Sequence, residues 1–468
     1  MSGPLQTARG ALAGTEAWVV GGAVRDRLLG RATADFDLVV AGDLRGHARA
    51  LARSLQGAAV FPLSEAFGAW RVIGPARDWN VDLSLLEGRI EDDLARRDFT
   101  VNALAQPLAG GEVLDLFDGR AHLAARRLAL VSPEALAADP LRALRLARLT
   151  CELGFEPDPE ARASAREHAP RLAEVSPERV FAELKRIVGG EDPLRGLTQM
   201  DELGLTAVVL PELEPLRDVQ QSDYHHLDVH AHTLAVLREL VELERDPAAA
   251  LGEHAGAAAD LLAEPLADDL TRGQALRFGA LLHDAAKPQT RALSVEGRVT
   301  FLGHDEQGAE LARGALARLR ASERLRAYVA TVTRHHLRLG FLVHRRPLSR
   351  RDVHRYLRAC EPLAADVTIL SVADRLATRG RNAEPAIAAH LEVARELLGQ
   401  ALAWRSGPPA PLVRGDDLAD ELGLEPGPEL GRLLDALAEA QFAGEVRDRA
   451  GAVRLARSLA QRTGPAAG

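Results

Sequence analysis

The stretch from residue 19 to residue 40, VVGGAVRDRLLGRATADFDLVV, constrains the fold of this 468-residue chain most. Its pattern predicts a short buried strand ending at Val20, a tight turn at Gly21 and Gly22, and a helix over residues 23–29. Glycines directly before a helix N-terminus allow backbone N–H groups to approach a phosphate closely. We therefore expect an anion site at this turn.

Two carboxylates follow this helix on a second predicted strand. Because side chains on a strand alternate between faces, Asp35 and Asp37 share one face, and Phe36 and Leu38 point to the other. Paired carboxylates suit Mg²⁺, which is usually held by one or two carboxylates together with substrate phosphates. Arg25, in the first turn of the helix, adds a fixed positive charge. A glycine turn or an Asp-x-Asp strand alone is common, but their adjacency predicts a magnesium-dependent nucleotide site.

Length and composition limit the broad class of protein. At about 150 residues per domain, the chain is expected to form roughly three domains. A composition that is 47% hydrophobic but only 4% aromatic is typical of Ala- and Leu-rich helices. No apolar run reaches the ~20 residues that span a bilayer, and the first residues lack the order of a secretory signal. With only Cys151 and Cys360 as cysteines, we expect a cytoplasmic protein without a disulfide framework or a membrane partner.

Two segments downstream carry further polar residues that suit a nucleotide site. Asp82, on a predicted strand over residues 79–85, is a candidate third carboxylate or else belongs to a solvated face. In IEDDLARRDFTVNALA, residues 90–105, arginines such as Arg97 could hold a triphosphate while Asn102 bonds a ribose hydroxyl. The alternative for this segment is an exposed helix end.

A third segment, ADPLRALRLARL at residues 138–149, predicts a helix with a basic stripe. Asp139 is expected to open the helix as its N-cap. Arg142, Arg145 and Arg148 recur every three residues and therefore lie along one face. Such a stripe is often only solvated, but here it follows a predicted nucleotide site. Because the net charge is −9, a polyanionic substrate would need a local basic face of this kind.

These motifs resemble the class II tRNA nucleotidyltransferase and bacterial poly(A) polymerase family. The resemblance covers about the first 190 residues and rests, in order, on GGAVRD (21–26), DFD (35–37), RRDFTVNALA (96–105), DPLRALRLAR (139–148), ELGF (152–155) and SPERVFAELKRI (176–187). It implies a polymerase-β-like mixed sheet with helices. It also implies that an RNA 3′ hydroxyl attacks the α-phosphate of a nucleotide and that pyrophosphate leaves.

The resemblance further implies roles for single residues. Asp35 and Asp37 would bind the catalytic Mg²⁺ ions, and Asp82 is the candidate third catalytic carboxylate. Asp139 and Arg142 would read the Watson-Crick edge of the base, since a carboxylate accepts from an exocyclic amine and a guanidinium donates to ring acceptors. The implied nucleotide contacts are Gly22, Arg25, Arg97, Arg142, Arg145 and Arg148.

Two departures from the family pattern bear on which nucleotides are added. Ala138 stands where members usually carry Glu, so Arg142 lacks one orienting partner and base selection is looser or supported elsewhere. Between Asp82 and Arg96 there is only LSLLEGRIEDDLA, whereas CCA-adding members have a longer flexible loop there. In this family, loss of that loop is associated with enzymes that add two cytidines and no adenosine. We therefore expect CC addition.

A second set of polar residues lies in the helical part of the chain. The order H, HD, H, HH, D resembles the HD phosphohydrolase superfamily over about residues 224–379. The resemblance implies one ion bound by His232, His283, Asp284 and Asp374, with His304 and His335 available for a second. Mixed ligands of this kind suit Mn²⁺, Ni²⁺, Fe²⁺, Co²⁺ or Zn²⁺. We expect phosphatase or 2′,3′-cyclic phosphodiesterase chemistry, unless the HD fold serves only as a scaffold for RNA.

The remaining segments complete the expected organisation. Residues 242–273 are rich in Ala, Asp and Glu and predict an insertion or a loose helical linker. SGPPAP at residues 406–411 predicts a hinge, and a helix is expected over residues 429–442. The expected fold class is α+β, with the parts being a nucleotidyltransferase head (1–125), an all-α neck (126–215), an HD domain (216–400) and a helical tail (412–460).

The expected function is addition of CC to the immature 3′ end of tRNA from CTP, without a nucleic-acid template and with Mg²⁺ in the head. Within the same chemistry, the alternatives are full CCA addition, A addition from ATP, and poly(A) synthesis. From another class, the alternative is a non-catalytic RNA-binding protein with the same fold. The sequence assigns no oligomeric state.

Overall fold

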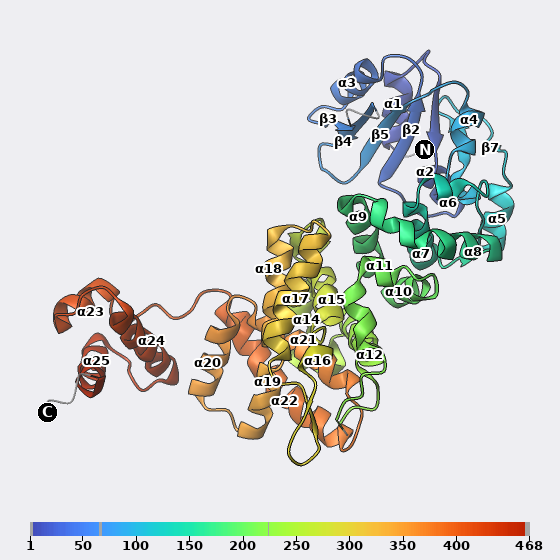
Figure 1. Cartoon of the computed structure of the whole chain (residues 1–468). Coiled ribbons are helices and arrows are strands. Elements are labelled where there is room, and N and C mark those ends of the chain that lie inside the picture. The colour runs from blue at the N-terminus through green and yellow to red at the C-terminus, as the bar shows by residue number, and fades with distance from the viewer. Residues whose placement is uncertain (1–2, 65–67, 223, 464–468) are drawn as a thin grey trace. The chain divides into compact units, whose positions relative to one another are not determined.

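The computed structural model describes residues 3–64, 68–222 and 224–463. Two compact units divide the chain, an N-terminal unit up to Val209 and a C-terminal unit from Leu210. Strands gather in the first part of the N-terminal unit, and helices dominate the rest of the chain (Figure 1). Among the described residues, no helix has the length and apolar character needed to cross a membrane.

One mixed sheet of seven strands forms the base of the N-terminal unit. Its spatial order is β3 (Ala59–Ser64), β4 (Ala69–Ile73), β5 (Asn80–Leu85), β2 (Asp35–Val40), β1 (Ala17–Val20), β6 (Leu104–Pro107) and β7 (Leu114–Asp115). Neighbouring strands run antiparallel except β2 and β5, which are parallel and place Asp37 beside Asp82. Two acidic residues that are far apart in the sequence therefore become neighbours.

The strand-turn-helix-strand unit predicted at residues 19–40 is present. On β2, Phe36 and Leu38 are buried while Asp35 and Asp37 face the other side. Helix α2 (Gly22–Leu28) begins directly after Gly21, whose φ is 67°. This backbone conformation favours glycine, and a Cβ atom there would lie 2.7 Å from Nη1 of Arg97, so the arginine would have to shift.

Helices cover the sheet and extend the N-terminal unit. They are α1 (Gly3–Ala11), α2, α3 (Leu44–Ser54), α4 (Ile90–Ala95), α5 (Gly119–Ala125), α6 (Ala135–Ala138), α7 (Leu141–Leu153), α8 (Pro159–His168), α9 (Pro177–Val188), α10 (Pro193–Glu202) and α11 (Thr206–Val209). Short pieces join them, namely η1 (Thr100–Asn102), η2 (Ala169–Glu174), β8 (Arg127–Leu128) and β9 (Glu156–Pro157). Helix α7, the predicted arginine helix, packs against α9 and α10. Its apolar side chains are buried, Arg142 and Arg145 are partly exposed, and Arg148 is buried.

The C-terminal unit is a helical bundle followed by a helical tail. The bundle comprises η3 (Pro211–Leu216), α12 (Val229–Arg245), α13 (Ala248–Leu251), η4 (Gly252–His254), α14 (Ala255–Ala263), α15 (Arg272–Leu282), α16 (Lys287–Thr290), α17 (His304–Arg318), α18 (Glu323–His335), α19 (Arg338–Leu342), η5 (Val343–Arg345), α20 (Arg350–Cys360), α21 (Ala364–Ala377) and α22 (Ala383–Trp404), with the hairpins β10 (Pro265–Ala267) with β11 (Leu270–Thr271) and β12 (Ala292–Leu293) with β13 (Val299–Thr300). Helices α12, α15, α18 and α21 pack on one another and form its centre.

Residues 242–273, predicted to be an insertion or a loose helical linker, are largely helical but are not loose. Helix α14 packs against α15, and Leu251, Leu261 and Leu262 are buried. These few leucines lie among many alanines, and alanine faces are poor markers of a buried side. The segment is an ordered part of the bundle.

The tail consists of α23 (Gly415–Leu422), α24 (Pro428–Ala443) and α25 (Arg449–Thr463). These helices share a hydrophobic cluster that includes Leu418, Leu433, Leu437 and Ala456. Helix α24 matches the predicted helix to within one residue at each end. The α+β class and the order of its parts, predicted from the sequence, are confirmed. The predicted limits of the four parts stay predictions.

Candidate nucleotide site and candidate metal centre

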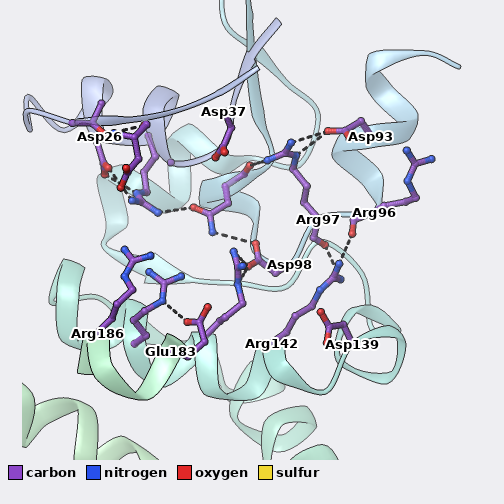
Figure 2. A pocket seen from close by; sticks show the side chains of 18 residues that line it. Asp26, Asp37, Asp93, Arg96, Arg97, Asp98, Asp139, Arg142, Glu183 and Arg186 are labelled. Carbon is purple, nitrogen blue, oxygen red and sulfur yellow. Dashed lines mark hydrogen bonds and ion pairs between the residues drawn. The ribbon is translucent and has the colours of Figure 1, made fainter. Parts of the chain in front are cut away.

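The N-terminal unit contains a polar pocket of about 410 Å³ between the start of strand β2 and helix α7 (Figure 2). We call it the arginine-rich pocket. The residues that line it are Gly21, Gly22, Arg25, Asp26, Thr33, Asp35, Asp37, Asp93, Arg96, Arg97, Asp98, Asn102, Asp139, Arg142, Arg145, Arg148, Glu183 and Arg186. The pocket thus unites Asp35, Asp37 and all eight residues that the sequence analysis assigned to the nucleotide.

The two strand carboxylates suit a hard cation. Desolvation within the pocket raises the pKa of Asp37. The negative charges of Asp82 and Asp35 raise this pKa further, and the positive charge of Arg97 lowers it. Carboxylates crowded in this way repel one another, and a divalent cation relieves the repulsion. Asp35 and Asp37 therefore fit the predicted role of Mg²⁺ ligands by their chemistry and their shared face.

Asp82 lies beside Asp37 in the sheet but does not line the pocket. Its carboxylate accepts two hydrogen bonds from Arg71 on β4, each 2.7 Å long. Its role as a third metal ligand stays a prediction, and it would require exchange of this ion pair.

A chain of buried hydrogen bonds fixes the arginines on both sides of the pocket. Arg25 donates to Oδ1 of Asn102 at 2.7 Å, and Nδ2 of Asn102 donates to Asp98 at 3.1 Å. Arg145 donates to the other Asp98 oxygen at 2.7 Å. Burial alone would raise the pKa of Asp98, but Arg145, Asn102 and the Phe99 N–H group lower it to about 2. Asp98 is therefore an anion that positions its neighbours.

Asn102 was predicted to bond a ribose hydroxyl. Both ends of its amide already have partners, so the structure gives it a positioning role between Arg25 and Asp98. One amide hydrogen is left over, since the NH₂ group has two donors. The ribose contact stays a prediction that relies on this hydrogen.

The predicted base-reading pair lies at the start of α7. Asp139 is not the N-cap residue of the helix, which begins at Leu141, but its carboxylate still accepts from the Leu141 N–H group. It also pairs with Arg179 at 2.7 Å. Arg142 donates to the backbone carbonyl groups of Arg96, Arg97 and Ala135. These carbonyl groups orient Arg142 although Ala138 offers no carboxylate, and the effect on base selection stays a prediction.

Arg148 differs from the other stripe arginines because it is buried. Its guanidinium pairs with Glu183 on α9 and with Glu152 at 2.6 Å. It borders the pocket, but its charge is already used by two carboxylates. This geometry favours a supporting role for Arg148 over the direct nucleotide contact implied by the resemblance.

Sequence reasoning did not assign several residues that line the pocket. Asp26 pairs with Arg25, and Asp93 pairs with Arg97. Glu183 and Arg186 come from α9, a segment that was quoted only as part of the resemblance. The spacing of Asp93 and Arg97, four residues apart, could have predicted their ion pair from the sequence. No pattern in one sequence shows that α9 packs beside α7.

A second cluster of polar side chains lies inside the C-terminal bundle. It contains two groups of potential ligand atoms, one from His232, His283 and Asp374 and one from Asp284, His304 and His336. Within each group, these atoms lie within 4.8 Å of one another. His283, His304 and His336 each place Nδ1 within 2.8 Å of a backbone carbonyl oxygen three residues earlier. This fixes the hydrogen on Nδ1 and leaves the Nε2 lone pair for a ligand.

The donor set fits a metal. Nε2 atoms of His232, His283 and His304 are buried and have no hydrogen-bond partner. Burial lowers the pKa of His336 to about 4, so its imidazole is neutral at neutral pH. Neutral imidazoles with carboxylates suit the transition metals named above. Lys287 lies at the edge of the cluster, where its Nζ is 2.7 Å from Asp284.

The prediction of His335 as a ligand was wrong, because the structure places His336 in the cluster instead. Val329, Val332 and Thr333 form the buried face of α18, and His336 continues that face. His335 points away and accepts a hydrogen bond from Arg338 at 2.8 Å.

Comparison with known proteins shows the family to which this chain belongs. Family models match for the poly(A) polymerase head domain over residues 17–74 and 62–129, the probable RNA and SrmB-binding site of polymerase A over residues 154–216, and the HD domain over residues 229–379. An A-adding tRNA nucleotidyltransferase of Deinococcus radiodurans is 37% identical over 451 residues, which are 95% of this chain and 94% of that protein. A CC-adding tRNA nucleotidyltransferase of Thermus thermophilus is 37% identical over 440 residues, or 92% and 91% of the two chains. This chain therefore belongs to the tRNA nucleotidyltransferase and poly(A) polymerase family.

Solved structures share the fold. The complex of a CCA-adding enzyme with CTP has a TM-score of 0.62 at 18% identity and covers 98% of this chain and 94% of that chain. A Thermotoga maritima CCA-adding enzyme complexed with tRNA has a TM-score of 0.59, also at 18% identity, with the same coverage. At such low identity the likeness concerns the fold alone.

Proposed function

We propose that this protein adds cytidines to the immature 3′ end of tRNA, using CTP and Mg²⁺ and no nucleic-acid template. The observation that carries the proposal is a single pocket that holds the Asp35 and Asp37 carboxylates opposite the arginines of α7. A triphosphate with its cation needs both kinds of group, because carboxylates hold the cation and guanidinium groups bind phosphate oxygens. The curated relatives are named for the same reaction type.

The residues of this chain mainly position the nucleotide and neutralise the negative charge of its phosphates. Bound Mg²⁺ would lower the pKa of the attacking hydroxyl and neutralise the departing pyrophosphate. Arg25 and Arg97 flank the glycine turn and are placed for the phosphates. Asp139 and Arg142 are placed for the base, since cytosine offers an exocyclic amine to a carboxylate and acceptors to a guanidinium.

The choice of CC over CCA addition rests on one short connection. Strand β5 ends at Leu85 and helix α4 begins at Ile90, so residues 86–89 alone join them. The longer loop that CCA-adding members have at this place is absent from these described residues. The relatives do not decide between the products, because an A-adding and a CC-adding protein are equally similar to this chain.

The test uses three tRNA transcripts, one that lacks CCA and others that end in the first or second C. Each is incubated with CTP, ATP or both, and the products are sequenced. With CTP, we expect addition of two, one and no nucleotides, respectively, whether or not ATP is also present. With ATP alone, we expect no addition. Addition of A to the third transcript would overturn the CC assignment. Tight RNA binding without any incorporation would favour the non-catalytic alternative.

A second function is favoured by the buried Nε2 atoms without hydrogen-bond partners in the HD domain. We propose that this cluster binds a transition metal and hydrolyses phosphomonoesters or 2′,3′-cyclic phosphates. Such a metal activates water at neutral pH, and Lys287 is placed to bind a phosphate oxygen. Phosphate release with added Mn²⁺ or Ni²⁺ is the expected result. Absence of turnover together with no bound metal in elemental analysis would contradict it.

A further inference from the structure

Helix α20 carries a basic ridge in a chain whose net charge is −9. Arg350, Arg351, Arg355 and Arg358 lie on it, and we call them the α20 arginines. Asp352 is the acidic residue of this helix, and it caps the helix N-terminus together with Ser349. The ridge is therefore not neutralised within its own helix.

Acidic side chains of the tail cover this ridge. Arg351 pairs with Glu439 at 3.3 Å and with Glu445 at 2.5 Å. Arg355 pairs with the same Glu439 at 2.8 Å. Arg358 lies 3.4 Å from Asp435, and it also pairs with Glu361 in the bundle. Asp435 and Glu439 of helix α24, together with Glu445 just beyond its end, thus face three of the α20 arginines.

These ion pairs are easily exchanged. The side chains of Arg351, Arg355 and Arg358 are 41%, 60% and 47% exposed. Among their partners, Glu445 and Asp435 are 47% and 73% exposed, and Glu439 is 17% exposed. Exposed pairs contribute little to stability and weaken as the salt concentration rises. A partner with a denser negative charge can therefore replace the tail carboxylates.

The packing beneath the ion pairs is incomplete. His354 of α20, Trp404 of α22 and Phe442 of α24 form a cluster of rings, with centroids 5.4 to 5.7 Å apart. His354 Nε2 and Trp404 Nε1 are buried without a hydrogen-bond partner. A cavity of about 290 Å³ lies against the same three rings. Unpaired polar atoms and unfilled space both weaken an interface.

The tail can leave this interface without unfolding. Its three helices have their own hydrophobic cluster, which includes Leu418, Leu437 and Ala456. The Pro/Gly-rich segment at residues 406–411 joins it to α22. Such a linker permits movement of a folded module.

We propose that the tail docks reversibly on helix α20 and that the α20 arginines, once released, bind backbone phosphates of the RNA substrate. At 1.5 Å per residue, Arg351 to Arg358 spans about 10 Å of helix axis. A nucleic-acid strand presents about three phosphates over that length. Guanidinium groups bind phosphate oxygens in pairs, so three arginines can exchange carboxylates for phosphates one for one. The identity of the partner as tRNA rests on the proposed function.

The test uses two triple variants that break the same ion pairs from opposite sides. One changes Asp435→Asn, Glu439→Gln and Glu445→Gln, and the other changes Arg351→Gln, Arg355→Gln and Arg358→Gln. Docking is monitored by energy transfer between one dye on Gln400→Cys of α22 and another on Arg432→Cys of α24. Both positions are exposed, whereas the two native cysteines are buried and should not be labelled. RNA affinity is measured by filter binding as a function of salt.

Both triple variants should lower energy transfer, and so should added tRNA in the otherwise unchanged chain. The carboxylate variant should bind tRNA at least about threefold more tightly. The arginine variant should bind more weakly, and the slope of log affinity against log salt should fall by up to roughly 0.7–0.9 per lost contact. Glu310→Gln and Arg334→Gln, which remove one exposed pair between α17 and α18, report the general effect of charge.

The proposal is overturned if tRNA leaves energy transfer unchanged, if both triple variants shift RNA affinity in the same direction, or if the control changes have the same effect per charge. Affinity and energy transfer do not depend on nucleotide incorporation. A failure of the proposed function is therefore distinguishable from a failure of this inference.

Discussion

At the scale of single residues, the arginine-rich pocket is organised by one buried anion. Asp98 holds Arg145 directly and Arg25 through Asn102, so arginines on opposite sides of the pocket share one anchor. Fixed guanidinium groups lose little entropy when a phosphate arrives, which makes them effective catalytic groups. The same anchor contributes to stability, and this contribution depends on pH.

We expect Asp98→Asn to lower the free energy of unfolding by about 2 kcal/mol at pH 7, from a pKa shift of about two units. Because the folded-state pKa of Asp98 is about 2 and the ordinary value is 3.8, the stabilisation is complete above about pH 4 and is lost as pH falls toward 2. Urea unfolding of both proteins between pH 7 and pH 3 measures this difference. Asp158→Asn, which breaks an exposed pair with Arg127, is the control and should have a smaller effect. A difference that stays constant down to pH 3 would contradict the assignment.

We expect Asp37→Asn to reduce CTP incorporation at least about a thousandfold, because loss of a metal ligand removes several kcal/mol of transition-state stabilisation. RNA binding should remain, since the carboxylate is not part of a basic surface. Asp82→Asn should reduce incorporation less, because Arg71 holds that side chain. Equal losses in the two variants would show that Asp82 is a full partner of the metal site.

At the scale of elements, the periodicity of the sequence predicted which side chains share a face of a strand or a helix. Alternation on β2 placed Asp35 and Asp37 on one face, and three-residue spacing placed the arginines of α7 together. Pairing between distant segments could not be read in this way. The parallel register that brings Asp82 beside Asp37, the Arg71 partner of Asp82 and the α9 residues in the pocket all depend on tertiary packing.

A further prediction concerns which of two adjacent histidines at the end of helix α18 lies on its buried face. We expect His336→Ala to lower the metal content of the purified protein at least about tenfold, since loss of a ligand or its support typically costs 10- to 100-fold in metal affinity. His335→Ala is the matched control, because its side chain lies outside the cluster and should leave metal content unchanged. Elemental analysis and melting temperature distinguish the two. Loss of metal in the His335 variant alone would restore the original prediction from the sequence.

At the scale of the whole molecule, the chain consists of two compact units, and each contains one of the two candidate sites. The arginine-rich pocket lies in the N-terminal unit, and the cluster of candidate metal ligands lies in the C-terminal unit. A ligand that binds only the folded form of a unit stabilises that unit.

We therefore expect calorimetry of the full chain to show two unfolding transitions, as multidomain proteins commonly do. Mg²⁺ with CTP should raise one melting temperature, and a chelator that removes a transition metal should lower the other. Asp98→Asn should shift only the transition that responds to CTP. A single transition that moves with both treatments would contradict the independence of the two units.

We expect Asp35 and Asp37 to hold the cation with which a cytidine is joined to a tRNA end. The most direct measurement is incorporation of labelled CTP into tRNA that lacks CCA, with Mg²⁺, in the unchanged protein and in Asp37→Asn. We expect extension by two cytidines in the unchanged protein, no further growth when ATP is added, and almost no product in Asp37→Asn. Undiminished incorporation by Asp37→Asn, or none by the unchanged protein, would contradict it.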